Sequence, residues 1–78
     1  MSKLQKVFID ALGLDGDATD WANLKYRGIP EWDSVAHMQL VAEIEDAFDI
    51  MLETDDVIGM SSFLVAREIL TKYDVTDA

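Results

Sequence analysis

The sequence predicts an all-α protein, a small four-helix bundle with three longer helices and one short one. Apolar residues recur every three to four positions in three stretches, which is the spacing of a helix with one buried face. Serine, threonine or aspartate stands just before several helical segments, where its side chain can cap the free N–H groups of a first turn. No pair of strands is indicated. We therefore treat residues 1–78 as a single domain.

The first helix is expected from about residue 3 to residue 12, with Gly13 as its stop. Its apolar positions share helical spacing: Leu4, Val7, Phe8, Ala11 and Leu12. Residues 15–31 lack a sustained period and contain glycine and proline, so they predict a long, mostly irregular connection. Four apolar residues could pin this connection to the bundle: Trp21, Leu24, Tyr26 and Ile29.

A run that begins at Asp15 superficially resembles an EF-hand calcium loop. It places oxygen-bearing side chains at the first, third and fifth positions. The sixth position holds Asp20 where a glycine must turn, and the twelfth holds Tyr26 where a bidentate glutamate is needed. We therefore predict no metal site.

The longest helix is expected to run from Asp33 or Ser34 to about Phe48, because Pro30 cannot lie inside a helix and either residue can cap a first turn. Its predicted core residues share one face: Leu40, Val41, Ile44 and Phe48. The other faces mix apolar and acidic side chains, which suits either a partner surface or a merely solvated acidic face. These residues include Val35, Met38, Ala42, Glu45 and Asp46. His37, the only histidine, is expected at the surface or at an interface.

The rest of the chain predicts one short helix and one longer helix. Residues 49–53 are expected to be a linker with buried contacts. Thr54 as a capping residue and the carboxylates after it favour a helix of one or two turns that Gly59 ends. Ser61 or Ser62 is expected to cap a last helix with the apolar residues Phe63, Ala66, Ile69, Leu70 and Tyr73. The tail from Asp74 is expected to fray.

Composition restricts the function. Sixteen acidic residues against six basic ones give a net charge of −10, which disfavours nucleic acid and favours partners with basic patches. Without cysteine the chain has no disulfide and no thiol nucleophile of its own. No apolar run is long enough to span a bilayer, and the start of the chain does not resemble a signal peptide, so we expect a cytoplasmic protein. No catalytic triad, metal cluster or glycine-rich phosphate loop indicates an enzyme.

Ser34 is the candidate site residue. A phosphate ester on its hydroxyl would lie at a helix N-terminus, where the backbone favours an anion, although Ser34 as merely a cap is the alternative. The triplet Asp33-Ser34-Val35, the helix end at residues 45–50 and a second apolar run about twenty residues later resemble the acyl carrier protein family. The resemblance extends from the first helix to Tyr73 and is strongest over residues 32–50.

The resemblance implies a bundle of acyl-carrier type with 4'-phosphopantetheine as a covalent cofactor on Ser34. A phosphopantetheinyl transferase would attach this arm with the help of magnesium. The arm would carry acyl or related groups as thioesters in fatty-acid or specialised biosynthesis, and the chain itself would be non-catalytic. A monomeric carrier would meet acyl-loading and acyl-processing enzymes with basic docking patches through six residues: Asp33, Val35, Met38, Ala42, Glu45 and Asp46.

Three positions depart from the family pattern. Val35 replaces the usual leucine, Trp32 precedes Asp33 where a small residue is common, and Gln39 occupies a usually acidic position. These departures keep a D-alanyl or peptidyl carrier open, and an unmodified acidic helical adaptor is a further alternative. A carrier also needs a core that can open between its second and third helices. The residues that would suit such a compliant interior are Met38, Met51, Met60, Ala42 and Ala66, although ordinary core packing is the simpler explanation for most of them.

Overall fold

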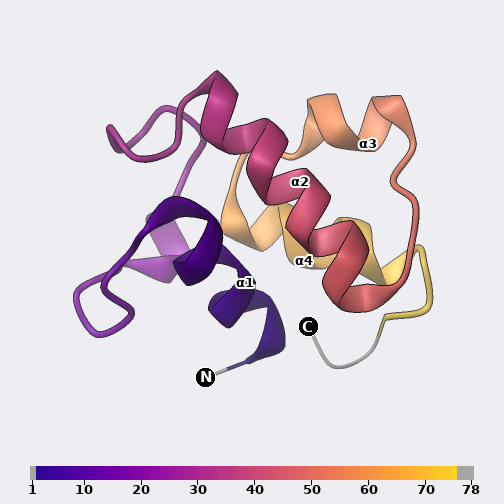
Figure 1. Ribbon diagram of the computed structural model, residues 1–78, viewed down its shortest axis with the longest axis horizontal. Coiled ribbons are helices and arrows are strands. Elements are labelled where there is room, and N and C mark those ends of the chain that lie inside the picture. The colour runs from indigo at the N-terminus through magenta and orange to yellow at the C-terminus, as the bar shows by residue number, and fades with distance from the viewer. Residues whose placement is uncertain (1, 76–78) are drawn as a thin grey trace.

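Four α-helices and one short 3-10 turn form the fold in a computed structural model that describes residues 2–75 (Figure 1). The elements in chain order are α1 Lys3–Leu12, η1 Trp21–Asn23, α2 Ser34–Phe48, α3 Thr54–Gly59 and α4 Phe63–Thr71. Within residues 2–75 there is no strand, only an isolated antiparallel bridge between Lys25 and Ser62. The prediction of a small all-α bundle with three longer helices and one short one is confirmed.

Local sequence sets the ends of the longer helices. Ser2 and Gln5 form a capping box at the start of α1, in which the Gln5 N–H donates to the Ser2 hydroxyl over 3.2 Å. Gly13 ends α1 in the left-handed region at φ 67°, as predicted. Ser62 rather than Ser61 caps α4, because its hydroxyl accepts the Val65 N–H at 3.1 Å.

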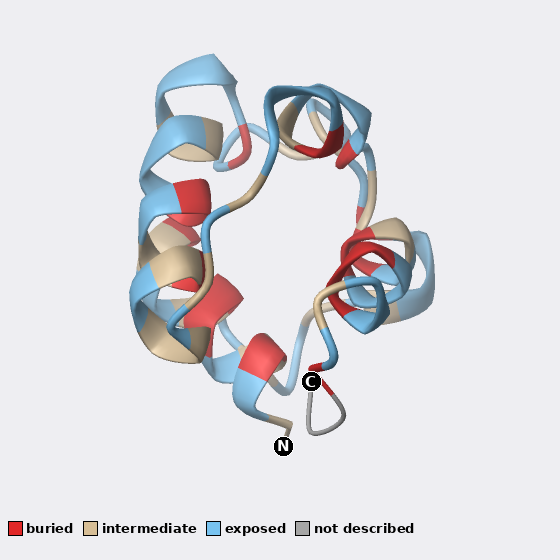
Figure 2. Ribbon diagram, turned by 90° about the vertical axis from the view of Figure 1, so that its right-hand side faces the viewer, coloured by how far each residue is buried: buried red, intermediate tan, exposed pale blue. Residues whose placement is uncertain are grey.

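The core lies where α1, α2 and α4 face one another, and buried residues line the inner faces of these helices (Figure 2). Leu40, Val41 and Ile44 of α2 are buried as predicted. Phe48 is half-buried, with the Lys3 ammonium 4.9 Å from its ring centre. The predicted apolar points of the long connection also pack on the core: Leu24 is buried, and Trp21, Tyr26 and Ile29 are half-buried.

The predicted compliant interior is largely wrong. Met38 and Met51 are 65% and 84% exposed, and Ala42 is exposed as well, because Met38 and Ala42 lie one turn apart on the solvent face of α2. Of the five residues proposed for this interior, only Met60 and Ala66 are buried.

Two predictions at helix ends are also wrong. The residue before α3 is Glu53, so Thr54 lies inside the helix and does not cap it. The tail does not fray at Asp74 and Val75. Asp74 turns the chain at φ 63°, and Val75 is buried with its N–H donating to the Leu70 carbonyl at 3.2 Å. Residues 76–78 lie outside the described part of the chain.

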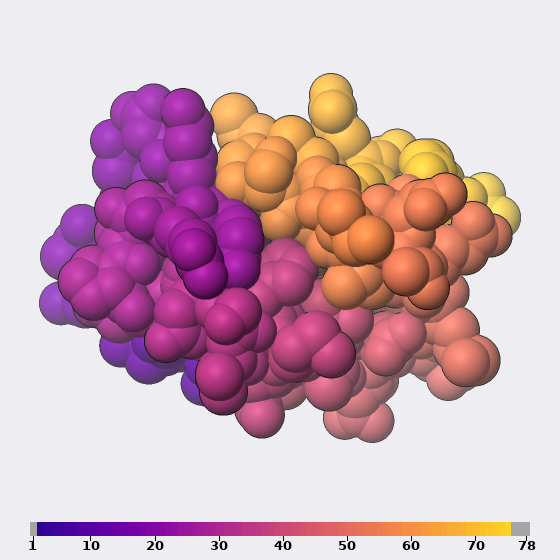
Figure 3. Space-filling view, turned by 90° about the horizontal axis from the view of Figure 1, so that it is seen from above, coloured from indigo at the N-terminus to yellow at the C-terminus, as the bar shows by residue number. Residues whose placement is uncertain are grey.

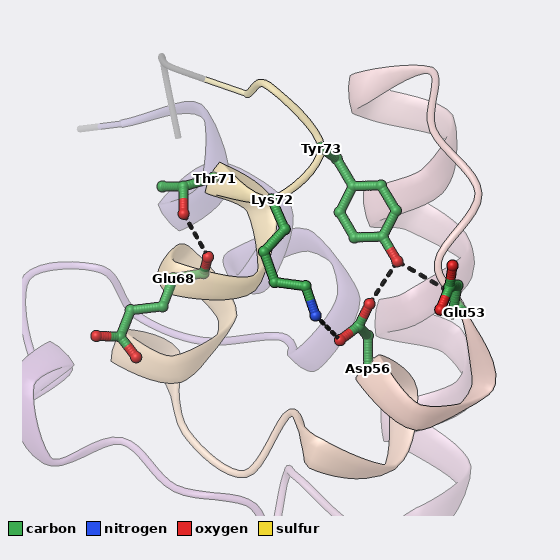
Figure 4. A network of polar contacts seen from close by, with 6 residues as sticks. All are labelled: Glu53, Asp56, Glu68, Thr71, Lys72 and Tyr73. Carbon is green, nitrogen blue, oxygen red and sulfur yellow. Dashed lines mark hydrogen bonds and ion pairs between the residues drawn. The ribbon is translucent and has the colours of Figure 1, made fainter.

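A polar network joins α3 to the end of α4 (Figure 4). The Asp56 carboxylate is buried, and it accepts hydrogen bonds from the Lys72 ammonium and the Tyr73 hydroxyl, each at 2.5 Å. The hydrogen bond from Lys72 and, to a smaller extent, that from Tyr73 hold the pKa of Asp56 below its usual value. The bonds to Asp56 raise the pKa values of Lys72 and Tyr73.

This network is expected to stabilise the fold between acid and alkaline extremes. Because the pKa of Asp56 is lowered by folding, its contribution is present above the usual carboxyl pKa and is lost as pH falls through the lowered value. The raised pKa of Tyr73 makes its contribution complete below the usual phenol pKa and lost as pH rises through the raised value. Urea unfolding from pH 6 to pH 2 should therefore show the stability gap between wild type and Asp56→Asn shrinking.

Asp55→Asn is the matched control, because Asp55 is the exposed neighbour of Asp56. Its gap to the wild type should vary much less with pH. Similar pH dependence for the two variants would mean that the network does not set the acid limit.

Candidate functional site

Trp32 fixes the chain immediately before α2. Its indole is fully buried, with the ring edge-to-face against Phe8 at 5.3 Å between centres. The turn that leads to it is closed by two backbone hydrogen bonds, from the Arg27 N–H to the Trp32 carbonyl at 2.8 Å and from the Trp32 N–H to the Ile29 carbonyl at 3.2 Å. The sequence drew attention to Trp32 only as a departure from a family pattern. In the fold this residue anchors the start of the helix that carries Ser34.

Asp33, and not Ser34, caps α2. The Asp33 carboxylate accepts the Ala36 N–H at 2.9 Å, and its own backbone is extended, as a cap requires. Ser34 is the first residue of the helix and is exposed. Its hydroxyl makes no hydrogen bond within residues 2–75. The alternative that Ser34 merely caps the helix is therefore wrong, because Asp33 is the cap and Ser34 is exposed.

His37 is half-buried and hydrogen-bonded within the protein rather than exposed at the surface. Its ring is nearly parallel to the Trp32 ring, with 20° between the planes. The Trp32 indole N–H donates to His37 Nδ1 at 3.0 Å. Since an indole nitrogen can only donate, the imidazole proton is on Nε2, which donates to the Val57 carbonyl of α3 at 2.9 Å. Both ring nitrogens are thus engaged inside the protein, and His37 is not free to serve Ser34 as a base.

The face of α2 beside Ser34 is exposed and mixes apolar with acidic groups. Val35 is 77% exposed and Met38 65%, and Ala42 and Asp46 are exposed too. Figure 3 shows the molecule from the side on which the loop before α2 (purple to magenta) and α3 (orange) reach the surface.

Ile58 of α3 is a further exposed apolar residue, at 77%. Its exposure was not among the sequence-based expectations. The sequence feature that could have indicated its exposure is its place in a helix of six residues, which is too short to bury many side chains.

Glu45 differs from the other five residues assigned to a partner surface. It is half-buried, and its Oε2 atom accepts the Leu52 N–H at 2.8 Å. This bond fixes the linker between α2 and α3. Asp33, Val35, Met38, Ala42 and Asp46 remain accessible, although the Asp33 carboxylate is also the helix cap.

A hollow of about 470 Å³ lies directly before the start of α2. It is lined by residues of the closed turn: Arg27, Gly28, Ile29, Pro30, Trp32 and Asp33. Arg27 gives this acidic protein a local positive charge, and its guanidinium lies 5.5 Å from the Tyr26 ring centre. Among residues 2–75, no cluster of three or more histidine or acidic side chains is placed to hold a metal ion.

Comparisons with known proteins provide no relative from which a function could be transferred. No family model, curated protein or solved structure matches this chain. Of the helices between residues 2 and 75, none combines the length and apolar character needed to cross a membrane. A functional assignment therefore depends on the residues around Ser34.

Proposed function

We propose that this chain is a carrier protein that holds acyl or related groups on a 4'-phosphopantetheine arm attached to Ser34. The observation that carries the proposal is the exposed hydroxyl of Ser34 at the first position of α2, which has no hydrogen-bond partner among residues 2–75. A helix start needs a capping side chain, and Asp33 already supplies it. An exposed serine next to the cap is available for modification without loss of the helix.

The residues around Ser34 suit a phosphodiester. The N–H groups of the first turn have no partner within the helix, and one of them, from Ala36, is taken by Asp33. The remaining N–H groups and the helix dipole favour an anion on the Ser34 oxygen. Trp32 keeps this end of α2 in place because its ring is buried in the core. When attached, the arm supplies a terminal thiol that can hold an acyl group as a thioester.

In the attachment step, the Ser34 oxygen would attack the phosphorus of coenzyme A that bears the pantetheine. A new P–O bond forms, and the bond to the adenosine bisphosphate leaving group breaks. The hydroxyl proton must pass to a base on the transferase, since His37 donates through one nitrogen and accepts through the other. The chain contributes the nucleophile and its orientation and performs no catalysis of its own.

The proposed partners are a phosphopantetheinyl transferase and enzymes that load and process the cargo. Val35, Met38 and Ala42 would provide apolar contact beside the arm, and Asp46 would provide charge on the same helix. A net charge of −10 favours association with basic surfaces. Among the cargo classes, acyl groups are the first proposal, and aminoacyl or peptidyl groups are consistent with the same site.

Incubation of the folded chain with coenzyme A, magnesium and several transferases tests the proposal. Intact-mass measurement should show the addition of one arm per chain. A folded chain that none of the transferases modifies would instead favour the unmodified acidic adaptor.

The Asp46→Lys variant should be modified more slowly than the wild type. Asp46 is exposed on α2, so a reversed charge there is expected to reduce the association rate with a basic transferase by roughly threefold to tenfold at low salt. The difference should shrink as salt is added, because exposed charges are screened beyond about 8 Å at physiological ionic strength.

Asp10→Lys is the matched control, with the same change of net charge on an exposed position of α1. Stopped-flow or initial-rate measurements across a sodium chloride series compare the two variants. Equal slowing of both would mean that net charge alone matters and that Asp46 is outside the interface.

A further inference from the structure

Arg27 is a cation beside the start of α2 in a protein of strongly acidic composition. Its backbone is fixed against the residues that lead into the helix, because the Arg27 N–H donates to the Trp32 carbonyl at 2.8 Å. Its φ of 62° lies in the left-handed region, which residues with a large side chain rarely adopt. The closed turn thus holds a long charged side chain where glycine or asparagine would fit with less strain.

The guanidinium of Arg27 has no anionic partner among the described residues. Within residues 2–75 the one ion pair joins Lys72 to Asp56, at the other end of the bundle's polar contacts. The group near the guanidinium is the Tyr26 ring, whose centre is 5.5 Å away. A guanidinium carries five N–H donors and stays charged at any pH at which the protein is studied. In the described part of the chain these donors and this charge are therefore unused.

The hollow before α2 brings Arg27 close to the residue that precedes Ser34. Arg27 and Asp33 line the same space of about 470 Å³, together with the apolar side chains of Ile29 and Pro30. The Asp33 carboxylate is not paired with the guanidinium, since it accepts the Ala36 N–H at 2.9 Å as the helix cap. One side of the hollow is therefore cationic and another is apolar, and Ser34 follows directly after its last lining residue.

We propose that Arg27 binds a phosphate ester carried by the Ser34 oxygen, with the hollow as the space in which the two groups meet. Both groups extend several ångströms from backbone segments that the Arg27–Trp32 hydrogen bond holds side by side. A guanidinium can donate two parallel hydrogen bonds to a phosphate, and such charge-assisted bonds are stronger than neutral ones. In a carrier this contact would hold the first atoms of the arm beside the turn. That use rests on the proposed function, whereas the binding of a phosphate on Ser34 does not.

The folded chain with phosphoserine incorporated at position 34 tests this contact without a transferase. Phosphorus NMR follows the phosphate as its second proton leaves, near pH 6 in an ordinary phosphoserine. A neighbouring guanidinium favours the dianion, so Arg27→Gln should raise the phosphate pKa by at least about 0.3 at low salt. The difference should shrink in sodium chloride. Arg27→Lys keeps the charge and should retain most of the wild-type value. Arg27 is exposed, so both variants leave the core intact.

Lys25→Gln is the matched control, because it removes the same charge from an exposed position two residues away that does not line the hollow. It should raise the phosphate pKa by less than half as much as Arg27→Gln. The proposal is overturned if Arg27→Gln has no effect or no larger an effect than Lys25→Gln. It is also overturned if Arg27→Lys behaves like Arg27→Gln, since the effect would then not follow the charge. Failure of every transferase to modify Ser34 would count against the carrier function and would leave this measurement unaffected.

Discussion

Ser34→Ala is expected to abolish attachment of the arm while changing the free energy of unfolding by less than about 0.5 kcal/mol. Attachment is lost completely because no other atom can replace the nucleophilic oxygen. Stability is nearly unchanged because the Ser34 hydroxyl does not cap α2, and alanine is a good helix former. Intact mass after incubation with a transferase measures the first effect, and urea unfolding measures the second.

Two control variants separate modification from helix capping. Asp33→Ala removes the cap and should lower the free energy of unfolding by about 1 kcal/mol while leaving a hydroxyl to be modified. Ser61→Ala removes an exposed serine elsewhere and should leave both properties unchanged. A Ser34→Ala chain that still gains an arm, or that loses as much stability as Asp33→Ala, would contradict the assignment.

Trp32→Ala should have the largest effect on stability, a loss of about 3–5 kcal/mol. The indole is fully buried against Phe8 and Tyr26, and its removal would leave a cavity and an unpaired His37 nitrogen. A domain of 78 residues has little stability to spare, so partial unfolding at room temperature is the expected outcome. Urea denaturation monitored by circular dichroism provides the measurement.

Trp21→Ala serves as the comparison, because Trp21 is only half-buried although it also contacts Phe8 and Phe63. Its loss of stability should be clearly smaller. Trp32→Phe should fall between wild type and alanine, since it keeps a ring but lacks the indole N–H. A Trp32→Ala chain as stable as the wild type would mean that Trp32 does not anchor the start of α2.

The helices could be predicted because their signals are local. The repeated apolar positions and the stop at Gly13 need only residues within a few turns of one another, and they identified α1, α2 and α4. The local sequence did not decide whether Asp33 or Ser34 is the cap of α2. Both side chains suit a cap, and the fixed turn at Trp32 puts Asp33 in the extended conformation of the cap position.

The contacts that hold α3 could not be predicted from the pattern. His37 and Val57 are 20 positions apart in the sequence, as are Glu53 and Tyr73, and each contact depends on how two helices dock. Helical periodicity predicted Tyr73 as an apolar position of the last helix, but α4 ends at Thr71 and Tyr73 lies in the turn after it. The pattern also could not show that the Tyr73 hydroxyl meets Asp56. Glu45 was assigned to a partner surface for the same reason, since its bond to Leu52 arises only when the linker folds back.

Peptide mapping by tandem mass spectrometry tests the central claim most directly. The folded wild-type chain is incubated with coenzyme A, magnesium and several phosphopantetheinyl transferases, then digested and sequenced. We predict 4'-phosphopantetheine on Ser34 and on no other residue. An arm on a different serine or threonine, or a folded chain that every transferase leaves unmodified, would contradict the assignment of this protein as a carrier modified at Ser34.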